Sequence, residues 1–416
     1  MNYETRVCSE FAWQISTDAK GLIKMSRSQP IRVAYDAQAF LSPNGGTGKG
    51  VQLRNLLGPF ANTFLGFATK GKNYAEHALI QGGIGGYRVW QQLSLPVMLH
   101  QWKADYFLAP YNTAPLLIPK RTKLILVLHD AICLGEYVGN DLRGQVDHAY
   151  RHLLVKKAVL RADKVLTVSE YSKRQILERY PEARVRVIPC SISSIWFDAD
   201  ARKKIEDRDN YIFMVTASVP HKNASGALRG YARYVASVGA SGGAATAARL
   251  RIVGLSNAKE KFAREARDLG VESLVDFEPY VTDAELRDLY RRARAVLFPS
   301  FMEGFGIPAL EAMASGTPVV LSNAGSLPEV GGDAAIYFDP RDVEGMGSAL
   351  TQVLSDPQLQ QRMMEAGLQQ AQRFHPDAIQ REVQEFWKEV AGKTSGDQAP
   401  NFFSLDQEGA VVEQRR

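Results

Sequence analysis

The segment at residues 296–321 constrains the fold of this chain more than any other. It reads VLFPSFMEGFGIPALEAMASGTPVVL. Two apolar runs flank a turn that contains two glycines, and Pro308 follows this turn where a helix-forming stretch begins. The segment therefore predicts a buried strand, a turn, a helix that Pro308 opens at its first position, and a second buried strand that begins near Pro318.

The turn in this segment is suited to binding a diphosphate. Backbone N–H groups and the positive end of a helix dipole point out of such a turn. Glu303 precedes the turn and Glu311 lies inside the helix. Phosphates do not require nearby acids, but a carboxylate accepts strong hydrogen bonds from sugar hydroxyls. The combination suggests that the segment binds a nucleotide sugar.

The remainder of the chain repeats the alternation of strand and helix. Strands are predicted at residues 31–35, 106–109, 123–128, 164–168 and 185–189, and then at 211–216, 250–254 and 275–277. Helices are predicted at residues 51–57, from 169 onward, and at 224–238, 259–269, 283–293, 345–355, 357–372 and 376–390. Two successive blocks of this kind predict two parallel sheets, each covered on both faces, with ligands beyond the carboxyl ends of the strands.

The length of 416 residues exceeds one ordinary hydrophobic core, which favours two domains. A charge-rich stretch near residues 199–210 marks the boundary between them. We expect an extension at 1–30, an N-terminal domain at 31–199, a C-terminal domain at 200–375, a helix at 376–392 that packs back toward the N-terminal domain, and a disordered polar tail at 393–416.

Composition indicates a folded protein of a reducing compartment. The apolar share of 45% and the charged share of 23% are typical of soluble globular chains. Cys8, Cys133 and Cys190 are widely spaced, which fits neither a zinc cluster nor a disulfide framework. No apolar stretch has the length of a membrane span, and the first residues lack the order of a secretory signal. We expect a cytoplasmic protein, either free or peripheral at the inner face of the cytoplasmic membrane.

The segment at residues 142–164 leaves two interpretations open. It carries six basic and two acidic residues, with Leu153, Leu154, Val155, Ala158 and Val159 among them. A basic amphipathic helix on an anionic membrane surface is one interpretation, and a helix buried on one side with a solvated basic face is the other. The net charge of +5 is mild, and we expect no nucleic-acid partner.

Three blocks of sequence resemble the retaining glycosyltransferases of the GT-B architecture, family 4. The first is a pair of glutamates with seven residues between them, which include GFGIP, followed by ASGTPVV and SLPEV. The second is YIFMVTASVPHKN at residues 211–223, and the third runs from VAYDA to NGGTGKG at residues 33–50. The resemblance is close over about residues 270–340 and fainter elsewhere. It implies an α/β fold of the GT-B type, with two facing Rossmann-like parallel-sheet domains and a cleft between them. The domain at 31–199 would lie on the acceptor side, and the domain at 200–375 would bind the nucleotide sugar.

The resemblance also implies roles for individual residues at the donor. Lys222 would contact the diphosphate, and His221 occupies a neighbouring place that often holds arginine. Glu303 would bind hydroxyls of the transferred sugar, and Glu311 those of the ribose. The turn that contributes backbone groups is made of Gly304, Phe305, Gly306 and Ile307. The family's second basic residue is missing, because residues 216–218 read Thr-Ala-Ser.

Four further residues are assigned by the same resemblance. Gly45 and Gly46 would cover the donor phosphates from the N-terminal domain, although a plain flexible turn is the alternative. His129 would contact the transferred sugar, and a histidine that only fills the core is the alternative. Val281 matches a position whose backbone meets the nucleobase. Lys222, Glu303 and His129 are the residues that we expect to act in catalysis.

The resemblance predicts transfer of a hexose from a nucleoside diphosphate sugar to a hydroxyl, with the anomeric configuration retained. We expect no metal and no cofactor, because no Asp-x-Asp pair stands at a strand end and Lys222 with the helix terminus can balance the charge. GDP-mannose is the preferred donor, and a lipid-linked or growing polysaccharide is the preferred acceptor. The alternatives are a UDP-hexose as donor, a sugar-nucleotide epimerase, and a regulator that binds nucleotide sugars without turnover.

Overall fold

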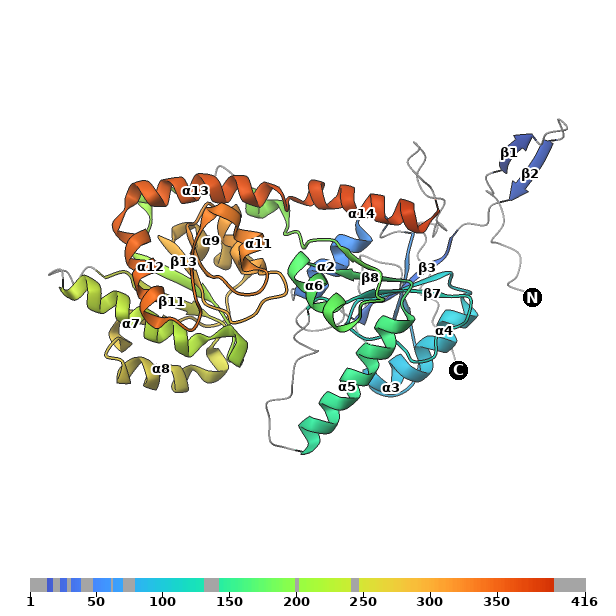
Figure 1. Cartoon of the computed structure of the whole chain (residues 1–416), viewed down its shortest axis with the longest axis horizontal. Coiled ribbons are helices and arrows are strands. Elements are labelled where there is room, and N and C mark those ends of the chain that lie inside the picture. Colours follow the sequence, from blue (N-terminus) through green and yellow to red (C-terminus); the bar gives the residue numbers. More distant parts are fainter. Residues whose placement is uncertain are drawn as a thin grey trace.

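The computed structural model describes residues 13–17, 23–27, 31–38, 48–60, 63–69, 79–130, 142–198, 202–240 and 247–392. These residues form two α/β lobes that lie side by side, which we call the N-domain and the C-domain (Figure 1). The predictions for Gly45, Gly46, Cys8, Cys133 and the tail at 393–416 fall outside the described residues.

Within its described part, the N-domain contains a parallel sheet of seven strands in the order β5-β4-β3-β6-β7-β8-β9. The strands are β3 (Val33–Asp36), β4 (Leu65–Ala68), β5 (Leu79–Gln81), β6 (Tyr106–Ala109), β7 (Lys123–Val127), β8 (Lys164–Thr167) and β9 (Val185–Val187). Its helical segments are α2 (Gly48–Leu57), η1 (Gly58–Phe60), α3 (Tyr87–Val89), the π-helix η2 (Trp90–Ser94), α4 (Leu95–Gln101), α5 (Leu142–Arg161) and α6 (Glu170–Arg179). Strands such as β7 are almost entirely apolar because helices cover both faces of the sheet.

Among the residues described there, the C-domain contains a parallel sheet of six strands in the order β12-β11-β10-β13-β14-β15. These strands are β10 (Tyr211–Val215), β11 (Arg249–Val253), β12 (Val275–Phe277), β13 (Ala295–Phe298), β14 (Val319–Ser322) and β15 (Ala335–Phe338). The α-helices are α7 (Ala224–Ala240), α8 (Lys259–Asp268), α9 (Asp283–Arg292), α10 (Ile307–Ala314), α11 (Leu327–Gly331), α12 (Val343–Ser355) and α13 (Pro357–Gln372). Short 3-10 turns are η4 (Ser194–Phe197), η5 (Ile205–Asp207), η6 (Pro220–Lys222), η8 (Ser256–Ala258), η9 (Glu272–Leu274) and η10 (Gly332–Ala334).

The last described helix, α14 (Pro376–Val390), leaves the C-domain and lies along the N-domain (Figure 1). Its apolar side enters the core between α2 and the seven-stranded sheet through Ile379, Val383, Phe386 and Trp387. The indole N–H of Trp387 donates to the carbonyl of Leu56 at 2.9 Å. The core of the N-domain therefore contains residues from both ends of the chain.

In each sheet, the next two strands of the chain lie on one side of the first strand, and the later strands lie on its other side. The place between these two groups of strands is called the switch point. In the N-domain it lies between β3 and β6, and in the C-domain between β10 and β13. Loops that leave these paired strands diverge, and ligands of open α/β sheets bind where they part. The hydroxyl of Ser169, which follows β8, donates to the carbonyl of Gly304, which follows β13, at 2.7 Å. The carboxyl edges of the two sheets therefore face each other.

Several features differ from expectation, among them β4, β5 and the helical segments at residues 87–101, which were not predicted. Pro308 is the second residue of α10, because the helix begins at Ile307. Within the extension at 1–30, for which no regular element was predicted, β1 (Trp13–Thr17) and β2 (Ile23–Arg27) pair as an antiparallel hairpin.

Candidate active site

The ammonium group of Lys222 lies at the switch point of the C-domain. Lys222 ends the turn η6, which follows β10. Two hydrogen bonds fix this turn beside the end of β13: the backbone N–H of Phe301 donates to the carbonyl of His221 at 2.8 Å, and the side-chain amide of Asn223 donates to the carbonyl of Pro299 at 3.0 Å. Asn223 itself adopts the left-handed conformation that ends η6. These hydrogen bonds hold Lys222 between the ends of β10 and β13, the two strands of the switch point.

Glu303 follows β13, the second strand of the switch point, and it pairs with Lys222. The Nζ atom of Lys222 lies 2.7 Å from Oε1 of Glu303. Both side chains are largely buried, with exposed fractions of 22% for Lys222 and 10% for Glu303. The ammonium also lies over the ring of Phe298, 5.5 Å from its centroid. Removing both charges from water costs free energy that their mutual attraction often fails to recover, so stability alone does not account for this buried ion pair.

Ser326 holds the turn that follows Glu303. Its hydroxyl lies 3.0 Å from the carbonyl oxygen of Glu303 and 2.8 Å from that of Phe305. Gly325 must approach the turn closely, since a Cβ atom there would lie 2.7 Å from the backbone nitrogen of Glu303. Gly306 has a φ of +102°, which a residue with a side chain rarely adopts. These contacts give the turn one defined backbone path into α10.

His129 and Gly304 bring the two domains into contact. A Cβ atom on Gly304 would lie 2.8 Å from the carbonyl oxygen of His129, so the two backbones meet without room for a methyl group. The ring nitrogen Nε2 of His129 lies 2.8 Å from the carbonyl of Pro110, and its backbone N–H donates to the side chain of Asn112 at 2.9 Å. His129 therefore lies beside the Glu303 turn, with its imidazole bonded to the N-domain.

A second contact joins the domains at the start of α6. The carboxylate of Glu329 accepts hydrogen bonds from the backbone N–H groups of Glu170 and Tyr171, at 2.9 and 3.2 Å. These N–H groups have no partner within their own helix, so an acid from the C-domain caps a helix of the N-domain. Glu329 thus serves the domain contact in this structure.

Glu311 projects from α10 and is bonded to Tyr290 of α9. The buried hydroxyl of Tyr290 donates to Oε2 of Glu311 at 3.1 Å. Burial raises the pKa of Glu311 to about 8, and the hydrogen bond from Tyr290 opposes this shift in part. The carboxyl group is therefore mostly protonated at neutral pH until a donor or a cation stabilises its charge.

The pKa of His221 is lowered, mainly by burial and next by the charge of Lys222, while Glu303 and Asp130 act in the opposite direction. The imidazole is therefore neutral at pH 7. Val281 is partly exposed and directly precedes Thr282, whose side chain caps α9. The structure thus places the predicted C-domain residues around the ends of β10, β12 and β13.

Arg208 fixes the helices that carry Tyr290 and Glu311. This buried guanidinium donates to the carbonyl of Ala293, just after α9, and to that of Gly316, just after α10, both at 2.8 Å. A cation at the carboxyl ends of two helices is favoured by both dipoles. Burial lowers the pKa of Arg208 to about 10, so it stays charged at neutral pH.

Comparison with known proteins identifies the family. A model of the group 1 glycosyl transferases matches residues 197–370, and one of Glycosyltransferase Family 4 matches residues 73–194. The O-antigen chain mannosyltransferase RfbU of Salmonella typhimurium is 31% identical over 269 residues, which cover 64% of this chain and 69% of that protein. The chain belongs to glycosyltransferase family 4.

Other relatives of this family 4 member match over a smaller share of their length. The O-antigen chain mannosyltransferase B of Escherichia coli is 31% identical over 222 residues, which are 50% of this chain and 56% of that protein. The chain thus spans little more than half of that relative.

Solved structures agree with the fold of the glycosyltransferase. Sucrose-phosphate synthase from Thermosynechococcus elongatus superposes with a TM-score of 0.67 at 17% identity, covering 88% of this chain and 100% of that one. Anabaena HepE in complex with UDP superposes with a TM-score of 0.65 at 16% identity, covering 87% of this chain and 100% of that one. At this identity the likeness confirms the GT-B fold alone.

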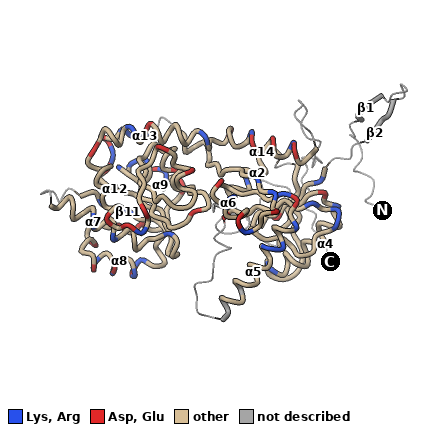
Figure 2. Tube along the Cα trace, in the orientation of Figure 1, with Lys and Arg blue, Asp and Glu red and all other residues tan. Residues whose placement is uncertain are grey.

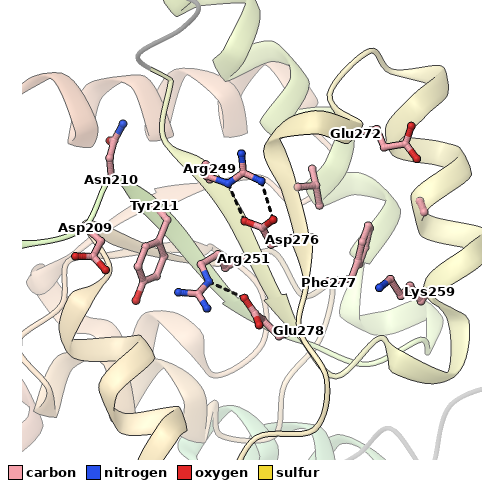
Figure 3. A pocket seen from close by; sticks show the side chains of 12 residues that line it. Asp209, Asn210, Tyr211, Arg249, Arg251, Lys259, Glu272, Asp276, Phe277 and Glu278 are labelled. Atoms are coloured by element: carbon pink, nitrogen blue, oxygen red, sulfur yellow. Dashed lines mark hydrogen bonds and ion pairs between the residues drawn. The ribbon is translucent and has the colours of Figure 1, made fainter.

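A surface hollow of about 760 Å³ has none of the candidate site residues on its wall (Figure 3). It opens over β11 and β12, and the residues Tyr211, Arg249 and Val275 on its wall are the first residues of their strands. Arg249 is paired with Asp276 at 2.7 Å and Arg251 with Glu278 at 2.6 Å. The hollow thus lies mainly toward the amino ends of the strands and its arginines are already neutralised, so we place the active site at the carboxyl ends instead.

Sequence reasoning missed several residues of this site. Tyr290, Ser326 and Arg208 act only through partners that lie 21 to 108 residues away in sequence. Ser169 was recognised as the start of a helix, and it is the N-cap of α6, but its bond to Gly304 had no signal in the sequence. These residues could be found only from the tertiary structure.

Proposed function

We propose that this glycosyltransferase moves a hexose from a nucleoside diphosphate sugar to an acceptor hydroxyl and retains the anomeric configuration. The observation that carries the proposal is the buried pair of Lys222 and Glu303 at the switch point of the C-domain, where it faces the N-domain. A diphosphate can take the place of Glu303 at the ammonium. The released carboxylate can then accept hydrogen bonds from sugar hydroxyls. Separation of the ion pair would therefore make Lys222 available to the diphosphate and Glu303 available to the sugar.

In the proposed reaction the bond between the anomeric carbon and the diphosphate oxygen breaks. The acceptor oxygen forms its new bond on the same face of the sugar, and the acceptor proton passes to the departing phosphate. Negative charge accumulates on the diphosphate, and Lys222 and the backbone N–H groups at the start of α10 would stabilise it. His129, beside Gly304, would contact the transferred sugar, while Gly45 and Gly46 would cover the phosphates. No metal and no cofactor has a role in this mechanism.

We further propose GDP-mannose as the donor and a lipid-linked or growing polysaccharide as the acceptor. Similarity to O-antigen chain mannosyltransferases supports mannose. A thermal-shift and calorimetric screen of GDP, UDP and their sugars tests the donor, and NMR of the product tests retention. Stabilisation by UDP but not by GDP would indicate that the donor contains uracil and not guanine. Release of an epimerised nucleotide sugar, or binding without any product, would exclude glycosyl transfer.

The proposed role of Glu311 predicts that nucleotide binding depends on pH. The ionised carboxylate accepts hydrogen bonds from ribose hydroxyls, and its pKa of about 8 means that binding below this pH must expel a proton. We expect the affinity for GDP to rise about fiftyfold between pH 6 and pH 8, measured by calorimetry, because the ionised fraction of Glu311 rises by about this factor. Glu311→Gln should bind weakly with a flat profile once titration of the phosphate is subtracted, and an unchanged profile would contradict the role.

The same pKa sets the sign of an effect on stability. Between the usual value of 4.5 and about 8, the folded chain keeps a proton on Glu311 that the unfolded chain has lost. The contribution of Glu311 to stability therefore falls as pH rises through this interval.

We also propose that the N-domain rests on an anionic membrane surface. On α5, Leu154, Val155, Ala158 and Val159 are buried against the sheet, as the second interpretation of this segment required. A different set of apolar residues is exposed at spacings that put them on the opposite side of the helix. This outward stripe consists of Val146, Tyr150, Leu153 and Leu160.

A second outward stripe lies on the neighbouring helical segment. Val89, Leu93 and Val97 recur every four residues and are each about half exposed. Of the 14 exposed large apolar side chains among the described residues, ten belong to these two stripes or to Ile84, Leu116 and Leu117. The same helix carries four exposed basic residues, Arg151, Lys156, Lys157 and Arg161. Figure 2 colours Lys and Arg blue along the trace. Exposed apolar and basic side chains on one helix fit the interface of an anionic bilayer.

This surface predicts reversible binding to vesicles. The full chain should sediment with vesicles of phosphatidylglycerol and phosphatidylcholine at low salt, and the bound fraction should fall as salt rises. Leu153→Asp combined with Leu160→Asp should weaken binding at least about fivefold. Ile195→Asp is the control, because Ile195 is equally exposed but lies outside the stripes. Equal binding by the double variant and the control would rule the surface out. No helix in the described part of the chain is long and apolar enough to cross a membrane.

A further inference from the structure

The amino end of α6 belongs to the N-domain, yet part of its hydrogen bonding comes from the C-domain. Glu329 of α11 accepts the backbone N–H groups of Glu170 and Tyr171. The N–H of the next residue, Ser172, donates at 3.1 Å to the hydroxyl oxygen of Ser169, the N-cap of the helix. The first N–H groups of an α-helix have no partner in its own backbone. Here the N-cap serine and an acid of the C-domain supply these partners, so the first turn of α6 is held against the C-domain.

The hydroxyl of Ser169 donates to the carbonyl oxygen of Gly304. Ser169 is fully buried, and its Oγ atom lies 2.7 Å from this carbonyl and 3.0 Å from the hydroxyl of Ser172. A hydroxyl has one proton to donate, and the shorter distance assigns that proton to Gly304. The hydroxyl of Ser172, which is also buried, lies 3.3 Å from the same carbonyl. Two hydroxyl groups of the N-domain therefore contact this one carbonyl of the C-domain.

Three successive carbonyl groups of the Glu303 turn have partners in different domains. The carbonyl oxygens of Glu303 and Phe305 lie 3.0 and 2.8 Å from the hydroxyl of Ser326, which belongs to the C-domain. The ring of Phe305 also packs edge to face on Phe374, with centroids 5.4 Å apart. The carbonyl of Gly304, between these two, is bonded instead to the serines of the N-domain. The direction of the peptide group between Gly304 and Phe305 is therefore set by the other domain.

The direction of this carbonyl also determines where the backbone N–H of Phe305 points. A trans peptide group is planar, so its C=O and its N–H point in opposite directions. Because the carbonyl of Gly304 is directed at α6, the N–H of Phe305 points away from α6. Among the residues that the structure describes, this N–H has no hydrogen-bond acceptor, although Phe305 is only 5% exposed. A buried donor without a partner costs free energy that a bound ligand can recover.

We propose that Ser169 is a positioning residue for glycosyl transfer, because its hydroxyl holds the Gly304–Phe305 peptide so that the N–H of Phe305 can donate to the departing diphosphate. This inference rests on the function proposed above. If the peptide group turned over, a carbonyl oxygen would take the place of the N–H and would repel the negative charge of the diphosphate. Glycine at position 304 permits such a rotation, since it has no side chain. The N-domain supplies the hydroxyl, so the Glu303 turn is ready for the donor only while the two domains are in contact.

Ser169→Ala tests this inference, because it removes the hydroxyl and leaves the backbone in place. The full chain is assayed for turnover of GDP-mannose. We expect kcat to fall about fivefold, since the N–H acts where charge develops in the transition state. The affinity for GMP, which lacks the second phosphate, should stay within about twofold of the wild type.

Asp356→Ala is the matched control, because Ser169→Ala also removes a helix cap. Asp356 is the N-cap of α13, and its side chain accepts the N–H of Leu359 at 2.9 Å. Both variants should lose a similar amount of melting temperature through the lost cap, and kcat should fall in Ser169→Ala alone. Unchanged kcat in Ser169→Ala, or an equal fall in the control, overturns the inference.

The N–H of Phe305 is also observed directly by NMR. The chain is labelled with ¹⁵N-phenylalanine, and the Phe305 signal is assigned by its loss in Phe305→Leu. At saturating GDP we expect a downfield shift of this amide proton in the wild type and in Asp356→Ala, and about half that shift or less in Ser169→Ala. Equal shifts in Ser169→Ala and the wild type overturn the inference.

Failure of the proposed function has a different signature. If the wild type turns over no nucleotide sugar, glycosyl transfer is excluded, and titrations with GDP and with UDP followed by NMR still decide the role of Ser169 at the diphosphate. A shift of the Phe305 signal that shrinks in Ser169→Ala supports positioning of the peptide. If neither nucleotide shifts this signal in the wild type, the inference is overturned.

Discussion

Lys222→Ala is expected to lower kcat/KM for glycosyl transfer about a hundredfold, or roughly 2.7 kcal/mol of transition-state stabilisation. The ammonium lies at the end of β10 and has Glu303 as its partner at 2.7 Å. In the proposed reaction it moves from this carboxylate to the diphosphate, where charge grows as the sugar leaves. Steady-state kinetics with the donor that the screen selects measure the loss.

Lys261→Ala provides the matched control for this change. Lys261 also lies over a phenylalanine ring, that of Phe262 at 5.1 Å, but it belongs to α8, away from the junction of the domains. The control should keep wild-type kinetics. The melting temperature is recorded in parallel, because Lys222→Ala also leaves the largely buried Glu303 without its partner. Transfer within a few-fold of the wild type would remove Lys222 from the mechanism.

Gly304→Ala is expected to reduce transfer at least about tenfold, or roughly 1.4 kcal/mol. The added methyl group would lie 2.8 Å from the carbonyl oxygen of His129 and 2.9 Å from Cβ of Asp130. Both contacts are with the other domain, so relief requires the domains to separate or the Glu303 turn to shift. Either movement displaces groups that must be aligned for the reaction.

Gly86→Ala is the control for this substitution, because a Cβ atom at Gly86 would meet nothing within 4 Å. Kinetics and thermal melting are measured for both variants, which should differ in activity and not in melting temperature. Gly304→Ala should lose activity with little change in melting temperature, since the contact lies between the domains and outside either core. If Gly304→Ala retains full activity, the close contact of the two backbones has no part in the reaction.

Local patterns were sufficient for much of the C-domain. The apolar runs and the proline of residues 296–321 correspond to β13, α10 and β14, and the bounds predicted for β12 and α13 are those observed. In these segments the periodicity, the helix-starting prolines and the tertiary packing all favour the same structure.

The missed strands of the N-domain show where such patterns fail. β4 reads LGFA, and Gly66 in its centre weakens any strand signal. A Cβ atom at Gly66 would lie 2.3 Å from the side chain of Leu79 and 2.8 Å from that of Tyr35. The glycine is therefore required by packing against two other strands. No pattern within residues 65–68 could reveal this requirement.

In the candidate site, too, some residues could be predicted from sequence, whereas their partners could not. Lys222, Glu303 and Glu311 were each predicted from the blocks around them, and the structure places them near one switch point. Their partners could not be predicted, because the bond from Tyr290 to Glu311 and the pairing of Lys222 with Glu303 depend on how separate strands and helices are arranged. Sequence indicated the candidate residues, and only the tertiary structure showed which partners they contact.

The return of α14 to the N-domain has a consequence for biosynthesis. Ile379, Val383, Phe386 and Trp387 complete a core most of whose other residues are translated before the C-domain. The ribosome delivers them only after the entire C-domain has been synthesised. The N-domain therefore emerges before the C-domain but is completed after it, and a nascent chain exposes the unfinished apolar surface of the N-domain throughout the interval.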